Sequence, residues 1–181
     1  MMDNPIITEL RAMAELGWNP EQKHFFEQRV KDARPVECVR MKDVFTSEQL
    51  RVLFETMKYK TRQKECYKNA SELVERVEWM ARHFDTGIPD VKYVEGFAYS
   101  CRIISIEHAF VKVGDQYIDP TFERALHEDV RKHIYVSLIE LDAEKMAQYQ
   151  AETGFYGDLY RYDYLKRYKP ELVAKILKAR E

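Results

Sequence analysis

Hydrophobic positions along the chain follow a helical period first, a strand period next, and a helical period again. In the first half apolar residues recur every three to four positions, which predicts amphipathic helices over residues 19–33, 46–60 and 64–84. Between residues 91 and 141 the period shortens to two and β-branched residues accumulate, which predicts a run of antiparallel strands. Helical spacing returns over residues 142–181. This order of elements indicates an α+β fold.

Local signals set the ends of these helices. Asn19, which precedes a proline, is a typical helix cap, and Thr46 with Gln49 has the spacing of a capping box. Asp142 is expected to cap the helix that follows the last strand. The helix of residues 64–84 should end near Phe84, because a glycine and a proline follow closely. Its expected buried stripe consists of Ala70, Leu73, Val77, Met80 and Ala81.

Length and composition favour one globular domain over residues 1–181. The chain has 45% hydrophobic and 33% charged residues and no stretch rich in glycine, proline or serine that would serve as a linker. We divide it into a helical N-terminal part (1–59), a core (60–141) and C-terminal helices (142–181). The net charge of -2 gives no electrostatic reason to expect a nucleic-acid partner.

The cysteines indicate a reducing environment. Cys38, Cys66 and Cys101 are odd in number and lack CxxC spacing, which argues against a disulfide framework and a structural zinc site. The first residues lack the basic-then-apolar order of a signal peptide, and no apolar run approaches the roughly 20 residues that cross a bilayer. We therefore expect a cytoplasmic protein without a membrane partner.

Four tyrosines near the C-terminus recur every fourth residue. On a helix, Tyr156, Tyr160, Tyr164 and Tyr168 would form one slowly drifting stripe. Such stripes are more often packed against the body of the protein than used for binding. A contact with another protein through this stripe is the alternative.

Cys66 stands at the expected start of the helix of residues 64–84. Free N–H groups and the positive end of the helix dipole stabilise an anion there, which lowers the pKa of a thiol from its usual value of about 8.5. The same N–H groups could bind the oxyanion of an acyl intermediate, and Gln63 could add a side-chain donor. The position therefore suits a nucleophile as well as a packed thiol.

A predicted hairpin supplies a base and a group to orient it. If Gly114 and Asp115 form a two-residue turn, Val113 pairs with Gln116, and His108 and Asp119 become diagonal neighbours on one face. A turn longer by one residue would move Asp119 to the other face. Taken singly, each residue is more often structural, but the order Cys66, His108, Asp119 follows the nucleophile–base–orienter logic of a thiol triad.

The motifs "ECYKNA" and "EHAFVKVGDQYIDPTF" resemble the transglutaminase-like branch of the papain-like superfamily. The resemblance covers residues 60–123 and implies a cysteine helix packed on an antiparallel sheet, with acyl chemistry through a thioester. It implies that Cys66 is the nucleophile, His108 the base and acid, and Asp119 the residue that orients His108. The chain departs from the family at Phe110, where tryptophan is usual, and on both sides of the cysteine.

The resulting hypothesis is a cysteine hydrolase that acts on a peptide, a protein or a small amide without a cofactor. The alternatives are an acyl transferase of the transglutaminase type and a papain-like binding module without chemistry. A zinc site is a further alternative, formed by the three triad residues, with Glu123 and His127 at i, i+4 spacing nearby.

Overall fold

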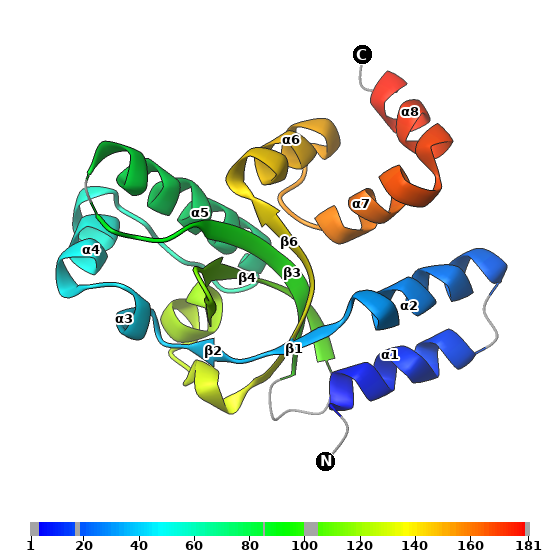
Figure 1. Ribbon diagram of the computed structural model, residues 1–181, viewed down its shortest axis with the longest axis horizontal. Coiled ribbons are helices and arrows are strands. Elements are labelled where there is room, and N and C mark those ends of the chain that lie inside the picture. The colour runs from blue at the N-terminus through cyan, green and yellow to red at the C-terminus, as the bar shows by residue number, and fades with distance from the viewer. Residues whose placement is uncertain (1–3, 17–18, 85, 100–104, 180–181) are drawn as a thin grey trace.

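A computed structural model describes residues 4–16, 19–84, 86–99 and 105–179; Cys101 lies outside these ranges. A curled six-stranded sheet forms the centre, and helices pack on its face and at its ends (Figure 1). The mixed α+β fold predicted from the sequence is therefore confirmed.

The central sheet has the strand order β1-β6-β3-β4-β5-β2. All neighbouring strands are antiparallel except β2 and β5, which run parallel. The strands are β1 (Arg34–Val36), β2 (Cys38–Val39), β3 (Val91–Tyr99), β4 (Ser105–Val113), β5 (Gln116–Ile118) and β6 (Ile134–Asp142). Strand β3 pairs with β4 on one side and with β6 on the other. Strand β4, which carries His108, therefore lies in the middle of the sheet.

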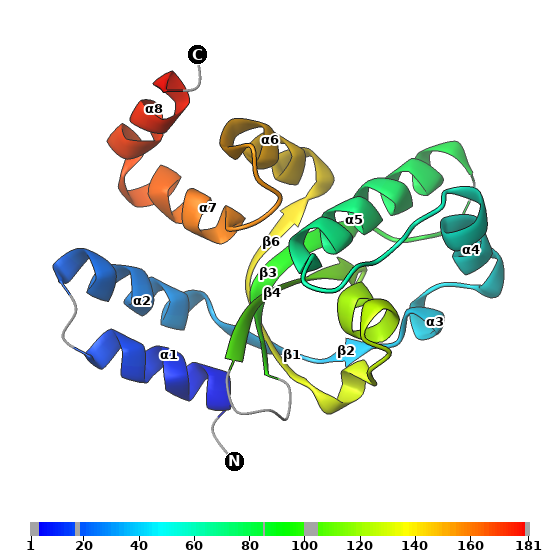
Figure 2. The same cartoon turned by 180° about the vertical axis from the view of Figure 1, so that it is seen from behind.

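Helices surround the sheet in three groups (Figures 1 and 2). The first pair, α1 (Pro5–Glu15) and α2 (Pro20–Asp32), lies side by side at one end of the sheet. The longest helix, α5 (Cys66–His83), covers one sheet face, near the short α3 (Met41–Val44) and α4 (Ser47–Arg51). The third group follows β6 and comprises α6 (Ala143–Thr153), α7 (Leu159–Tyr168) and α8 (Pro170–Lys178). The described part of the chain also contains three short helical turns, Val52–Thr56, Thr121–Ala125 and Val130–Lys132.

The predicted helix ends are confirmed at each capping residue. The side chain of Asn19 accepts a hydrogen bond from the first turn of α2, and Asp142 does the same for α6. Thr46 and Gln49 form both bonds of the capping box at α4. Helix α5 ends at His83. The prediction of a single helix over residues 46–60 is wrong, because α4 ends at Arg51 and is followed by the π-helical turn of residues 52–56.

The N-terminal part of the chain is less helical than expected. Residues 34–36 and 38–39 form strands that pair with β6 and β5, which lie far along the sequence. Strands of two or three residues are too short to show an alternating pattern, and their partners are not local, so sequence periodicity misses them. The apolar stripe of α5 also differs at its end, where Ala81 is exposed.

Two apolar layers fill the faces of the sheet. On one face Leu73, Val77 and Met80 of α5 are buried against side chains from β3 and β4 that include Tyr93 and Val111. On the opposite face lies a smaller cluster, which contains Cys38, Val94, Ala98, Phe110, Phe122, Val130 and Tyr135. Since successive strand residues point to opposite faces, His108 belongs with Phe110 in this second layer.

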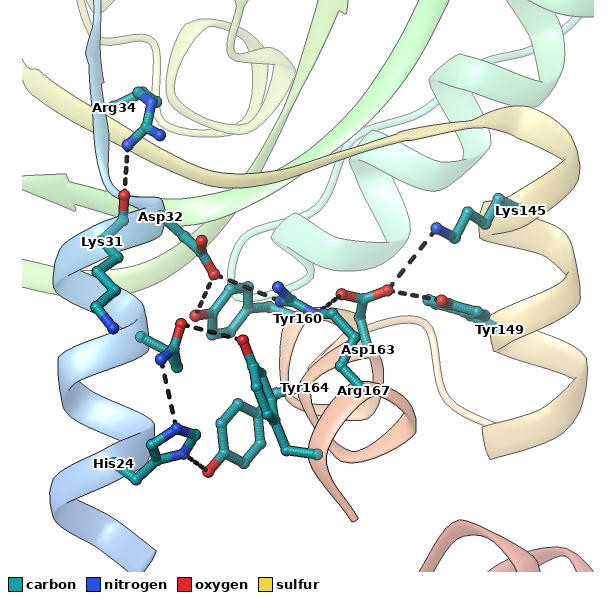
Figure 3. Close-up of polar contacts among 12 residues, drawn as sticks. His24, Lys31, Asp32, Arg34, Lys145, Tyr149, Tyr160, Asp163, Tyr164 and Arg167 are labelled. Atoms are coloured by element: carbon teal, nitrogen blue, oxygen red, sulfur yellow. Dashed lines mark hydrogen bonds and ion pairs between the residues drawn. The ribbon is translucent and has the colours of Figure 1, made fainter. Parts of the chain in front are cut away.

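The C-terminal tyrosines pack mainly inside the protein. Tyr160 and Tyr164 of α7 are buried against α2, where Tyr160 donates a hydrogen bond to Asp32 at 2.9 Å (Figure 3). The hydroxyl of Tyr164 lies 2.7 Å from Nδ1 of His24. Tyr156 precedes α7, so it does not share the helical stripe that was expected. The stripe thus joins the first and last helical groups.

Gly96 lies at a β-bulge in β3, where the backbone of β6 passes close to it. A Cβ atom there would meet the backbone oxygen of Val136 at 1.9 Å, so the substitution Gly96→Ala must push β6 away. We expect it to lower the free energy of unfolding by about 3 kcal/mol or more in a urea titration. Gly87→Ala is the control. A Cβ atom there meets nothing within 4 Å, so the only strain is that of an alanine at a positive φ. It should cost about 1–2 kcal/mol. Equal losses in the two variants would contradict a close strand contact at Gly96.

Candidate active site

Cys66 is the first residue of α5, and its side chain is partly buried. The cap residue Glu65 lies 3.8 Å from Arg62 as an ion pair. The backbone N–H groups of Tyr67 and Ala109 donate hydrogen bonds to the Cys66 sulfur. The thiol is therefore held by donors from the helix and from β4.

The predicted hairpin register is confirmed. Val113 pairs with Gln116 across the turn, and Gly114 adopts the left-handed backbone that a tight turn requires. This register brings Nε2 of His108 to 2.7 Å from Oδ2 of Asp119. Both residues are removed from solvent, with 2% and 0% of their surface exposed. The base and the orienting carboxylate of the hypothesis are thus in direct contact.

Asp119 is fixed by three further hydrogen bonds. Its Oδ1 accepts from the backbone N–H groups of Thr121 and Phe122, at 2.9 and 3.0 Å. Its Oδ2 accepts from the hydroxyl of Tyr135 at 3.0 Å as well as from His108. The carboxylate therefore holds Nε2 of His108 as the protonated ring nitrogen, which leaves Nδ1 for the thiol.

The thiol and the imidazole meet at an open edge of β4. Helix α5 packs on the face that carries Ala109 and Val111, whereas His108 points to the other face. Strand β5 pairs with β4 only as far as Val111, and no described strand continues along this edge toward Ser105. The start of α5 can therefore place Cys66 beside both Ala109 and His108.

The charged forms of Cys66 and His108 stabilise each other. Burial lowers the pKa of His108, but the charge and hydrogen bond of Asp119, with a smaller effect of Cys66, raise it from 6.5 to about 10. Burial raises the pKa of the Cys66 thiol, but the hydrogen bond and charge of His108, with the N–H groups of Ala109 and Tyr67, bring it below its ordinary value. This environment favours a thiolate paired with an imidazolium.

Cys38 lies in a different environment from Cys66, and the proposed oxyanion donor Gln63 is bonded to another part of the chain. Burial, and next the charge of Asp119, raise the pKa of the Cys38 thiol well above its ordinary value, which makes it a poor nucleophile. Cys101 lies outside the described residues. The amide of Gln63 donates to the carbonyl of Ala125 at 3.4 Å, at the end of the turn that follows Asp119.

Glu123 and His127, the further residues of the zinc alternative, are engaged or placed elsewhere. Glu123 accepts a hydrogen bond from the backbone N–H of Met41 at 2.8 Å, and His127 lies beyond the short turn of residues 121–125 with a positive φ. In the ranges that the structure describes, no group of three or more metal-ligating side chains is found.

Tyr135 is a residue of the site that the sequence pattern does not reveal. It lies in β6, which reads as an apolar strand, and β6 is separated from β4 by β3 in the sheet. A buried tyrosine hydroxyl needs a polar partner, and this was the only signal in the sequence. The partner is Asp119, and the curl of the sheet brings the two residues together.

Glu95 stands out in the sequence, but its role does not, because it connects the site to the C-terminal helices. It interrupts the apolar pattern of β3 and accepts hydrogen bonds from the N–H groups of Leu159 and Tyr160 at 3.0 and 2.8 Å. Burial raises its pKa to about 7, although these bonds and the hydroxyl of Tyr93 oppose the shift. Just before α7, Gly157 lies so close to the ring of Tyr67 that a Cβ atom would meet it at 2.3 Å.

Comparisons with protein-family models, curated proteins and solved structures return no match. None of the described helices combines the length and the apolar character that crossing a membrane requires.

The ionisation of His108 predicts how stability depends on pH. Because its pKa in the folded protein is raised from 6.5 to about 10, its contribution is complete below pH 6.5 and is lost as the pH rises toward 10. We expect the difference in unfolding free energy between wild type and His108→Gln to shrink by on the order of 3 kcal/mol across this window. Urea titrations at a series of pH values measure it, with His83→Gln at an exposed histidine as the control. A pH-independent difference would contradict a protonated His108.

Proposed function

We propose that the protein is a thiol-dependent hydrolase that acts on an amide, peptide or other acyl bond through a thioester on Cys66. The observation that carries the proposal is the continuous chain of contacts from Cys66 to His108 to Asp119. Chains of this kind perform nucleophilic catalysis on unrelated folds, because their function depends on geometry rather than on sequence position.

In the acylation step, the Cys66 thiolate attacks the carbonyl carbon of the substrate and a C–S bond forms. The carbonyl π electrons move to oxygen, and the tetrahedral intermediate carries an oxyanion. His108 then gives its Nδ1 proton to the departing amine, and the C–N bond breaks. The products of this step are a thioester on Cys66, a free amine and a neutral His108.

In the deacylation step, neutral His108 removes a proton from water, and the oxygen attacks the thioester carbonyl. Collapse of the second tetrahedral intermediate breaks the C–S bond, releases the carboxylic acid and restores the thiolate beside a protonated His108. Asp119 takes no proton in either step. Its contribution is to hold the ring orientation and to stabilise the imidazolium.

The oxyanion needs donors near the sulfur. The N–H groups of Tyr67 and Ala109 already point at the thiol, and a carbonyl oxygen bound there would be within their reach. Gln63 is the proposed side-chain donor, and it would have to leave the carbonyl of Ala125 to act. These donors are fixed by α5 and β4 rather than by mobile side chains, except for Gln63.

The motif resemblance to the transglutaminase-like branch supports the same chemistry and keeps acyl transfer as an alternative. In that case an amine would replace water in the second step. A papain-like binding module without chemistry is the remaining alternative. We favour hydrolysis because it needs no second substrate site, and we place it in a reducing cytoplasm, where the thiol of Cys66 stays free.

Selective alkylation of Cys66 tests the proposal. Iodoacetamide at pH 6.5 should label Cys66 first, as mapped by mass spectrometry, and His108→Ala should slow this reaction on the order of 10- to 100-fold, because the thiol returns toward its ordinary pKa. Cys38 is the internal control, since it is buried and should stay unlabelled in the folded protein.

A chromogenic ester adds a test of turnover. p-Nitrophenyl acetate should give an acetyl group on Cys66 and a burst of nitrophenol, which Cys66→Ser abolishes. An added primary amine should accelerate deacylation with a saturable dependence on its concentration if the site binds it as an acyl acceptor. If Cys66 reacts no faster than an unfolded cysteine and no burst occurs, the enzyme hypothesis is wrong and the binding module is favoured.

A further inference from the structure

Asn69 is an unexpected residue at its position. It lies in the second turn of α5, three residues after Cys66 and on the same side of the helix, and only 2% of its surface is exposed. Asparagine is a poor helix former, and a buried amide costs free energy unless its polar atoms are bonded. Its presence therefore needs a reason in its contacts.

The amide of Asn69 binds the loop that precedes the helix. Its Oδ1 accepts from the backbone N–H of Arg62 at 3.0 Å, and its Nδ2 donates to the carbonyl of the same residue at 2.7 Å. The backbone of Asn69 takes part too, because its carbonyl accepts from the buried hydroxyl of Tyr59 at 2.7 Å. One residue thus fixes the path of the chain into Cys66.

The same amide also binds the turn that carries Asp119. Nδ2 of Asn69 donates a second, fully buried hydrogen bond to Oγ1 of Thr121 at 3.0 Å. Thr121 is itself bonded through its N–H to Oδ1 of Asp119, and Asp119 is bonded to His108. A continuous series of hydrogen bonds therefore runs from the helix of the nucleophile to the base.

We propose that Asn69 and Thr121 are positioning residues that lock the start of α5 to the turn after β5 and thereby set the placement of the Cys66 thiol against His108. The inference rests on the proposed function for its catalytic meaning. It adds a second connection between α5, which carries Cys66, and the hairpin, which carries His108 and Asp119. The other polar contacts between the start of α5 and the hairpin region are those of the thiol with His108 and the Ala109 N–H, and that of Gln63 with Ala125, and the bond of Asn69 to Thr121 is the fully buried one that holds the helix itself.

The need for such a lock follows from the open edge of β4. Cys66 approaches this edge from the face covered by α5, while His108 lies on the other face, so no sheet hydrogen bond fixes their separation. A misplacement of about 1 Å is enough to reduce catalysis by roughly 100-fold. The bond between Asn69 and Thr121 is fully buried, and its geometry is held at both ends.

The matched variants Thr121→Val and Thr121→Ser test the proposal. Valine keeps the shape of threonine but cannot accept the bond from Asn69, whereas serine keeps the hydroxyl and loses only the methyl group. The measurement is the rate of Cys66 alkylation by iodoacetamide from pH 5 to 10. We expect Thr121→Val to move the midpoint upward by about one pH unit and to slow labelling at pH 6.5 about tenfold. Thr121→Ser should stay within about twofold of wild type.

A purely structural role would lower the melting temperature without moving the pH midpoint. Melting curves of all variants are therefore recorded, and Asn69→Asp, which places an oxygen against the Arg62 carbonyl, provides a second disruption from the helix side. If Thr121→Val does not fold, Thr121→Ala replaces it in the same comparison with Thr121→Ser.

The two hypotheses fail differently in this experiment. A wild-type Cys66 that labels like an ordinary thiol overturns the proposed function and, with it, the positioning role. A reactive wild-type Cys66 whose profile is unchanged in the hydroxyl-free variants and in Asn69→Asp overturns the positioning role alone.

Discussion

The hydrogen bond between His108 and Asp119 is the interaction on which the rest of the site depends. Removing both charged groups from water costs several kcal/mol for each, and their attraction offsets this only if the remaining polar atoms are also satisfied. Asp119 meets the condition with two backbone donors from its own turn and the hydroxyl of Tyr135. The end of β5, the strand β4 and the strand β6 must therefore all be in place before the pair is stable.

The turn that holds Asp119 also makes room for the nucleophile. Pro120 cannot donate to a strand ladder, so β5 ends after three residues and leaves the rest of β4 without a partner on that side among the described strands. The N–H of Ala109 on this free edge is taken by the sulfur of Cys66. One short strand thus orients the base and admits the helix that carries the thiol. A longer β5 would have filled the edge and separated them.

The parts of this arrangement that were predictable from the sequence are those set by local chemistry. The Gly114–Asp115 turn fixes the hairpin register, and with it the contact of His108 with Asp119, within twelve residues of chain. The start of α5 follows from helix periodicity. Tyr135 and the strands β1 and β2 were not predictable, because their roles depend on the order and curl of strands that are distant in the sequence. The contacts of Asn69 likewise depend on how α5 docks against the hairpin.

Glu95 shows why the C-terminal helices belong to the scaffold of the site. Helix α7 begins after Asp158, which adopts a left-handed backbone, and Glu95 of β3 bonds the free N–H groups of Leu159 and Tyr160. Glu95 lies at the bulge of β3, where it pairs with Ala109, and the next residue pairs with His108. A shift of α7 would therefore act on the strand segment that faces both the sulfur-binding N–H and the base. Since Tyr160 and Tyr164 also anchor α7 to α2, the first helical group supports α7 and, through it, the same short stretch of the sheet.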